Sequence, residues 1–214
     1  MIEDLAKQSE LPLVYIDTDT FVYQPTDSFL KDLNAKKVYM HLDEGSLKGM
    51  KYTPLKMWHQ IKEKSFGGIT IKESMHMWNA GLVAIPVDKR LACLELALAI
   101  CDDMCAAGVT PRLIEQYALS VALDRIYELK PADSFVGHYW GNKPEWDDYI
   151  KTFLADQHLK GNSIEQSVKD INDADLYKIP IFKHVSSKKP ALDKLLNKLL
   201  VKNKMWIKNI EKML

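Results

Sequence analysis

Hydrophobic and polar positions along the chain predict strands and helices in turn. Short apolar runs bounded by turn residues predict buried strands, and apolar residues three and four apart predict helices. The predicted strands are residues 12–16, 38–42, 69–71, 78–86 and 134–136. The predicted helices are residues 2–9, 28–33, 53–64, 88–107, 110–127, 146–160 and 163–172. Alternating strands and helices predict an α/β domain with a mostly parallel sheet and flanking helices.

Two carboxylates stand near the end of the first apolar run, residues 13–22, as Asp17-Thr18-Asp19. Side chains alternate along a strand, so Asp17 and Asp19 are expected on one face near its carboxyl end, where ligands of open α/β sheets gather. Paired carboxylates are costly without a neutralising charge, and a hard divalent cation, Mg²⁺ or Mn²⁺, supplies one. The alternative is a strand end followed by a solvated Asp-Thr turn.

The charge balance is neutral overall but uneven along the chain. The 214 residues, enough for one sizeable domain, hold 29 basic and 29 acidic residues. Residues 183–214 hold nine lysines and two acidic residues, a local net charge of +7 that leaves −7 on the remainder. We therefore expect a core over residues 1–182 and a basic C-terminal segment over residues 183–214.

Within that segment, lysines fall on one helical face and apolar residues recur at spacings of three and four on another. The apolar positions are Leu192, Leu195, Leu196, Leu199, Trp206, Ile207, Ile210, Met213 and Leu214. This pattern predicts an amphipathic helix that can lie on an anionic membrane surface. The alternative is a helix whose leucine face packs on its own domain.

Cysteine usage and the absence of long apolar runs bear on the compartment. Cys93, Cys101 and Cys105 all fall in one predicted helix and are better interpreted as small apolar residues than as a disulfide framework. No signal peptide pattern opens the chain, and no apolar run approaches the roughly 18 residues of a spanning helix. We expect a reducing, cytoplasmic setting, with peripheral contact at the inner face of a membrane, and no nucleic-acid partner.

Four motifs carry the candidate chemistry, and each follows or lies near the end of a predicted element. They are Asp17-x-Asp19, Asn79-Ala80-Gly81, Glu115-Gln116 and His138-Tyr139-Trp140-Gly141-Asn142-Lys143-Pro144. In this order they resemble the metal-dependent nucleotide-sugar glycosyltransferases of the GT-A fold, most closely family 8. The resemblance covers about residues 11–150. It implies a partial GT-A, Rossmann-like sheet.

The resemblance also implies a role for each motif. Asp17, Asp19 and His138 would hold Mn²⁺ or Mg²⁺ against the donor diphosphate. The donor-binding residues would be Asp17, Asp19, Asn79, Gly81, Gly141 and Lys143. Glu115 and Gln116 would be the catalytic pair. The implied activity is transfer of a sugar from a nucleotide sugar to a saccharide or lipid-linked saccharide acceptor.

The physical chemistry agrees with these roles. A departing nucleoside diphosphate gathers negative charge, which a divalent ion and a lysine stabilise. A histidine ligand must be neutral, so metal binding is expected to weaken below about pH 6. For each candidate the alternative is structural: a loop histidine with a backbone partner, a solvated lysine, a turn or bulge at Asn79 and Gly81, or a helix N-terminal acid at Glu115.

The sequence departs from the family pattern in two places. The His138 loop has one residue fewer between Gly141 and Lys143, and Trp146 falls one residue late. Sixteen residues precede Asp17, where the family has a nucleotide-binding βαβ half. We therefore expect weak activity from this chain alone, restored by an upstream segment or a partner chain.

Two alternative functions remain open. One is a phosphatase of the haloacid dehalogenase class. Its motif has Thr or Val four residues after the first aspartate, where this chain has Phe21. The other is a non-catalytic sugar- or nucleotide-binding module.

Overall fold

A computed structural model describes residues 6–24, 27–34, 37–172, 176 and 179–181. The chain divides into two compact units, Met1–Lys143 and Pro144–Leu214, which are described separately. The predicted boundary after residue 182 and the predicted helix over residues 183–214 lie outside the described residues and stay predictions.

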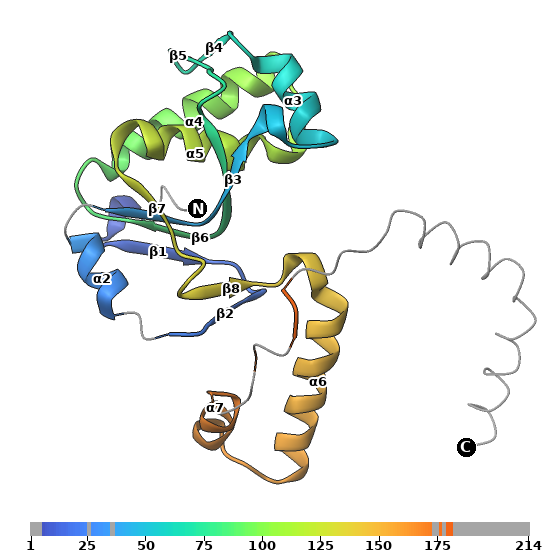
Figure 1. Ribbon diagram of the computed structural model, residues 1–214. Helices are drawn as coiled ribbons and strands as arrows, with labels where there is room; N and C mark the ends of the chain where they lie inside the picture. Colours follow the sequence, from blue (N-terminus) through green and yellow to red (C-terminus); the bar gives the residue numbers. More distant parts are fainter. Residues whose placement is uncertain (1–5, 25–26, 35–36, 173–175, 177–178, 182–214) are drawn as a thin grey trace, which may run out of the picture. The chain divides into compact units, whose positions relative to one another are not determined.

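The first unit contains all the strands of the described chain and the helices α2 to α5 (Figure 1). The strands are β1 (Leu13–Ile16), β2 (Thr20–Val22), β3 (Val38–Ser46), β4 (Ser65–Phe66), β5 (Ile69–Thr70), β6 (His76–Ile85), β7 (Leu129–Pro131) and β8 (Val136–His138). The helices are α2 (Asp27–Asn34), α3 (Thr53–Ile61), α4 (Arg90–Ala106) and α5 (Ile114–Ile126). Short 3₁₀ turns are η1 (Leu47–Gly49), η2 (Pro111–Leu113) and η3 (Trp140–Asn142).

The main sheet is mixed, which confirms an α/β fold and corrects one part of the prediction. Its strand order is β1-β6-β3-β7. β6 runs antiparallel to both β1 and β3, and only β3 and β7 are parallel. The prediction of a mostly parallel sheet was therefore wrong. Along the chain, strands still alternate with helices. The segment between β3 and β6 contains α3 and the β4–β5 hairpin, and it brings β6 beside β3 in the antiparallel direction.

The first apolar run forms two strands rather than one. β1 pairs with β6, whereas β2 pairs with β8 in a separate two-stranded sheet. Residues 17–19 form the connection between them, closed by a hydrogen bond of 2.7 Å from Thr20 Oγ1 to the carbonyl oxygen of Asp17. The two carboxylates therefore lie on a turn between two sheets, not on one face of a single strand.

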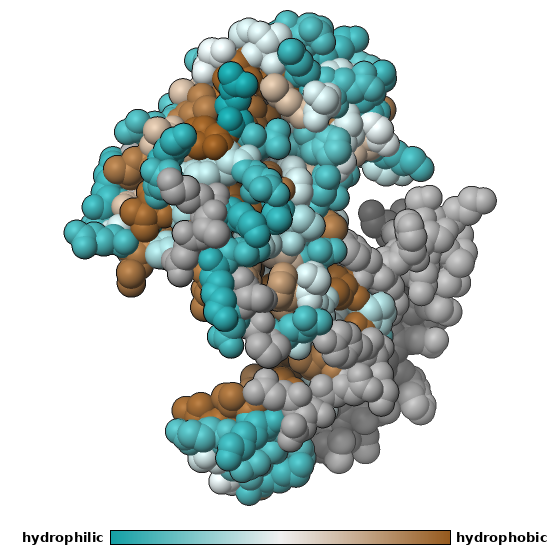
Figure 2. All heavy atoms as spheres, turned by 60° about the vertical axis from the view of Figure 1, so that its left-hand side comes forward, coloured by the Kyte–Doolittle hydropathy of each residue, from teal (hydrophilic) through white to brown (hydrophobic). Residues whose placement is uncertain are grey.

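Hydrophobic side chains fill the space between the sheet and the helices. The largest cluster packs residues of α3, α4 and α5 against β3 and β6. A smaller cluster from α2, β3, β6 and β8 includes Phe29, Leu33 and Leu82. All three cysteines lie in α4, as predicted, but that helix is not buried all round, because Leu91 and Leu98 are exposed. Figure 2 shows such hydrophobic side chains at the surface among hydrophilic ones.

Three segments differ from their predicted form. β3 continues through the polar residues 43–46, which the sequence placed in a loop. β7 was not predicted at all. Most of the expected loop after His138 is helical, because η3 leads directly into α6 (Lys143–Leu159). Pro144 stands in the first turn of α6, where a missing N–H costs nothing.

The second unit holds the rest of α6 and a second helix, α7 (Ile164–Asn172). The buried indole of Trp146 donates a hydrogen bond of 3.2 Å from Nε1 to the carbonyl oxygen of Pro180. Among the described residues, no helix has the length and apolar character that crossing a membrane requires.

Candidate metal centre

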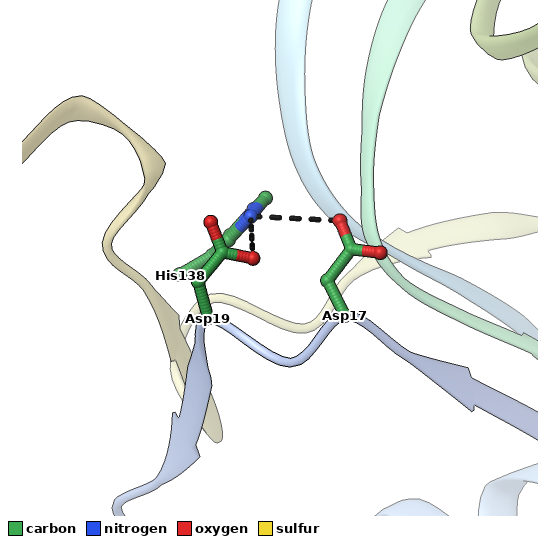
Figure 3. Close-up of side chains that lie close together, drawn as sticks. All are labelled: Asp17, Asp19 and His138. Carbon is green, nitrogen blue, oxygen red and sulfur yellow. Dashed lines mark ion pairs between the residues drawn. The ribbon is translucent and has the colours of Figure 1, made fainter. Parts of the chain in front are cut away.

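Asp17, Asp19 and His138 converge on one point, as the sequence predicted, and form a group that can hold a metal ion (Figure 3). One ligand atom from each lies within 4.8 Å of the others. His138 Nε2 is 3.2 Å from Asp19 Oδ1 and 3.6 Å from Asp17 Oδ2. Neighbouring ligands of an octahedral ion with bonds of about 2.1 Å lie about 3 Å apart. The site therefore needs only small adjustments to close on an ion.

Backbone pairing fixes the three ligands relative to one another. The Asp17 N–H donates to the carbonyl oxygen of Gly81 at 2.9 Å, which ties the turn to β6. The Tyr139 N–H donates to the carbonyl oxygen of Asp19 at 3.0 Å, and Thr20 pairs with His138 across β2 and β8. The site is therefore built where the two sheets meet.

The hydrogen bonds around His138 fix its tautomer. Asn79 Oδ1 accepts from the Gly81 N–H at 2.9 Å and lies 2.9 Å from His138 Nδ1. An amide oxygen only accepts, so Nδ1 carries the ring proton when the imidazole is neutral, and Nε2 then presents a lone pair. This Nε2 atom is buried and has no hydrogen-bond partner. A buried lone pair that faces two carboxylates can bind a cation placed between them.

The carboxylate oxygens that do not face His138 have donors of their own. Tyr15 Oη donates to Asp17 Oδ1 at 2.5 Å, and Lys143 Nζ donates to Asp19 Oδ2 at 2.7 Å. The hydrogen bond to Asp17, with burial, raises the pKa of Tyr15 to about 12. Burial alone would raise the pKa of Asp19, but the Lys143 hydrogen bond and the neighbouring His138 lower it overall. Each of the three side chains therefore has one polar atom bonded to a neighbouring group and another that faces the centre of the site.

A second buried histidine, His41, packs edge-on against His138 with ring centroids 5.3 Å apart. His41 Nε2 lies 3.0 Å from the carbonyl oxygen of Val136, to which it donates. Burial lowers the pKa of His41, so it stays neutral at pH 7. His41 could not be selected from the sequence, because it lies in a predicted apolar strand.

The remaining predicted residues lie around this centre in different ways. Gly81 is buried beneath the His138 ring, where a Cβ would stand 2.0 Å from Nδ1. Gly141 is half-buried in η3. Glu115 and Gln116 line a cavity of about 330 Å³ together with Tyr15, Asp17 and Arg112. Asn79 and Gly81 therefore both lie against His138. The family resemblance had placed them among the donor-binding residues instead.

Two further residues of the site, besides His41, were missed. Tyr15 could have been found, because it precedes Asp17 by two positions and so shares its strand face. Glu44 accepts hydrogen bonds from Asn79 and Gln116 but stands in a stretch that the sequence placed in a loop. Its polar neighbours gave no signal that a strand would carry it inward.

Comparison of the chain with protein-family models, with curated proteins and with solved structures gives no significant match. The functional argument therefore depends on the geometry of the site and on the motifs.

Replacing Tyr15 by phenylalanine tests the outer support of the metal centre. The Tyr15→Phe variant keeps the ring but removes the donor to Asp17 Oδ1, so the carboxylate gains rotational freedom. Loss of an outer-shell partner typically costs about 10-fold or more in metal affinity, and we expect Mn²⁺ affinity to fall by about that factor. Isothermal titration would measure it. Phenylalanine at Tyr52, a tyrosine with 84% exposure, is the matched control and should change nothing.

Proposed function

We propose that this chain is a metal-dependent nucleotide-sugar glycosyltransferase that uses Mn²⁺ or Mg²⁺ at Asp17, Asp19 and His138. The observation that carries the proposal is the buried Nε2 of His138, which makes no hydrogen bond and faces two carboxylates. The two carboxylates suit both Mn²⁺ and Mg²⁺. Such ions bind substrate phosphates as well as protein ligands.

The surroundings of the site support a phosphate-bearing substrate. The Lys143 ammonium, 2.7 Å from Asp19 Oδ2, adds a positive charge beside the ligands. Arg112 lines the adjoining cavity. A bound divalent ion would neutralise charge on a departing diphosphate. Lys143 would act on the same charge, and the pair Glu115 and Gln116 would contact the transferred sugar or its acceptor from the cavity wall.

The decisive experiment incubates the purified chain with a panel of nucleotide sugars, with and without a saccharide acceptor. We expect nucleoside diphosphate release that needs Mn²⁺ or Mg²⁺ and stops with EDTA. Release of phosphate from simple phosphomonoesters would instead indicate a phosphatase. Metal-dependent binding of nucleotide sugar without turnover would indicate a binding module.

Within the basic C-terminal segment, the amphipathic pattern over residues 190–214 favours peripheral membrane binding by the same protein. Each lysine near an anionic surface contributes about 1 kcal/mol. We expect the full chain to co-sediment with liposomes containing anionic lipid at low salt. A chain ending at residue 189 is expected to remain in the supernatant. Equal recovery of the full chain in the supernatant, with and without anionic lipid, would contradict membrane binding.

A further inference from the structure

A third carboxylate, Glu44, lies outside the metal centre and accepts hydrogen bonds from two side-chain amides. Asn79 Nδ2 donates to Glu44 Oε1 at 3.1 Å, and Gln116 Nε2 donates to Glu44 Oε2 at 3.2 Å. Asn79 in turn contacts His138, whereas Gln116 lines the cavity beside Asp17. Glu44 thus joins a residue that contacts a metal ligand to a residue of the cavity wall.

The backbone is shaped to bring Glu44 to this place. In the pairing of β3 with β6, Asp43 lies opposite Trp78 and Gly45 lies opposite Met77, with a register shift between Asp43 and Gly45. Glu44 is therefore the extra residue of a β-bulge. Bulges re-aim single side chains and are common beside active sites. Gly45, with φ of 88°, supplies the left-handed conformation that follows the bulge.

The orientation of the Asn79 amide depends on two partners that cannot exchange roles. The Gly81 N–H can only donate, so it selects the Asn79 oxygen. A carboxylate can only accept, so Glu44 selects the Asn79 nitrogen. With both in place, Asn79 presents oxygen to His138 Nδ1, and the ring keeps Nε2 free. Without Glu44, the Asn79 nitrogen loses its acceptor, and the Gly81 N–H is left as the fixed donor that selects the amide oxygen, because a histidine ring can accept or donate according to its tautomer.

We propose that Glu44 is a positioning residue for the metal centre, which acts through Asn79 to hold His138 in the tautomer that exposes Nε2. The expected effect of Glu44 on metal affinity rests on the proposed function. The effect of Glu44 on the His138 tautomer does not, because the tautomer is a property of the metal-free chain. Gln116 holds the second Glu44 oxygen, so the cavity wall and the metal ligand share one hydrogen-bonded chain of side chains.

The test is a nitrogen-15 NMR spectrum of the histidine rings in metal-free protein above pH 7.5. The His138 signals are assigned by their loss in a His138→Gln variant. In the native chain we expect the Nδ1–H tautomer. In Glu44→Ala we expect a mixture of the two tautomers, and a fall in Mn²⁺ affinity of about 10-fold, the lower end for loss of outer-shell partners.

Glu44→Gln is the conservative variant. Its side-chain carbonyl can still accept from Asn79, so it should keep the native tautomer and lie within about twofold of native affinity. Glu73→Ala, which removes an exposed carboxylate paired with Lys48, is the control and should match the native chain. Glu44→Met fills the same space without an acceptor and replaces Glu44→Ala if that variant does not fold.

The possible outcomes separate the two proposals. A native tautomer in both Glu44→Ala and Glu44→Met would overturn the positioning role. Equal disturbance in Glu44→Gln and Glu44→Ala would assign Glu44 a purely structural role and would also overturn it. If the native chain binds no Mn²⁺, the proposed function fails, while a tautomer change in Glu44→Ala alone would still support the role of Glu44.

Discussion

Replacing Asp19 by alanine is expected to abolish measurable Mn²⁺ binding, with a loss of affinity of about a hundred-fold or more. Asp19 supplies an inward oxygen 3.2 Å from His138 Nε2 and also holds Lys143 through its other oxygen. Its removal deletes a ligand outright, whereas outer-shell losses already cost about 10- to 100-fold. The same loss is expected for Asp17→Ala and His138→Ala, and titration calorimetry or manganese EPR would measure it.

Asp124→Ala is the matched control for these variants. Asp124 is an exposed aspartate near the end of α5, so its loss should leave both Mn²⁺ affinity and the melting temperature near native values. Native affinity in Asp19→Ala would show that Mn²⁺ binds elsewhere, and the metal centre would have to be abandoned. Activity with nucleotide sugars should fall in parallel with affinity.

Gly81→Ala is expected to disable the site through packing alone, although it removes no polar group. A Cβ at this position would stand 2.0 Å from Nδ1 and 2.5 Å from Cε1 of the His138 ring. The ring must therefore move away from Asn79, and Nε2 moves with it. Overpacking of a filled interior typically costs about 1–3 kcal/mol, and we expect a destabilisation in that range. We also expect Mn²⁺ affinity to fall as far as in His138→Ala.

Gly49→Ala provides the comparison for this substitution. Gly49 has no heavy atom within 4 Å of a built Cβ and no positive φ, so alanine should fit without strain. Its thermal unfolding and metal titration should superimpose on those of the native chain. A Gly81→Ala variant with native metal affinity would mean that His138 can bind from a different ring position.

The residue types and their order predicted the metal ligands well, but not the way in which they meet. Asp17 and Asp19 were expected to share a face of one strand. They converge instead because the chain turns between β1 and β2, and a turn of two or three residues can bring consecutive carboxylates together as effectively as strand alternation. The choice of His138 depended on a motif resemblance, since no local pattern links positions so far apart in the chain.

The sheet direction and the supporting residues could not be predicted, for a physical reason in each case. β6 is buried along nearly its whole length, and a continuous apolar run is typical of a parallel strand, so its antiparallel direction could not be recognised from the sequence. Glu44 reaches Asn79 only because a bulge re-aims it, and the polar stretch Asp43-Glu44-Gly45-Ser46 is equally typical of a turn. Long-range pairing, not local propensity, decides both features.

The turn that carries Asp17 and Asp19 joins two sheets of unequal size. The four-stranded sheet has a helical layer and a large core, whereas the β2–β8 ribbon has three residues in each strand. A two-stranded ribbon of this kind is at best marginally stable by itself. An ion bound between Asp17, which directly follows β1, and His138, which ends β8, would link the ribbon to the four-stranded sheet. Because a ligand present at 100 times its Kd stabilises the native state by about 2.7 kcal/mol, the free divalent-cation concentration around the protein would set how often this ribbon detaches.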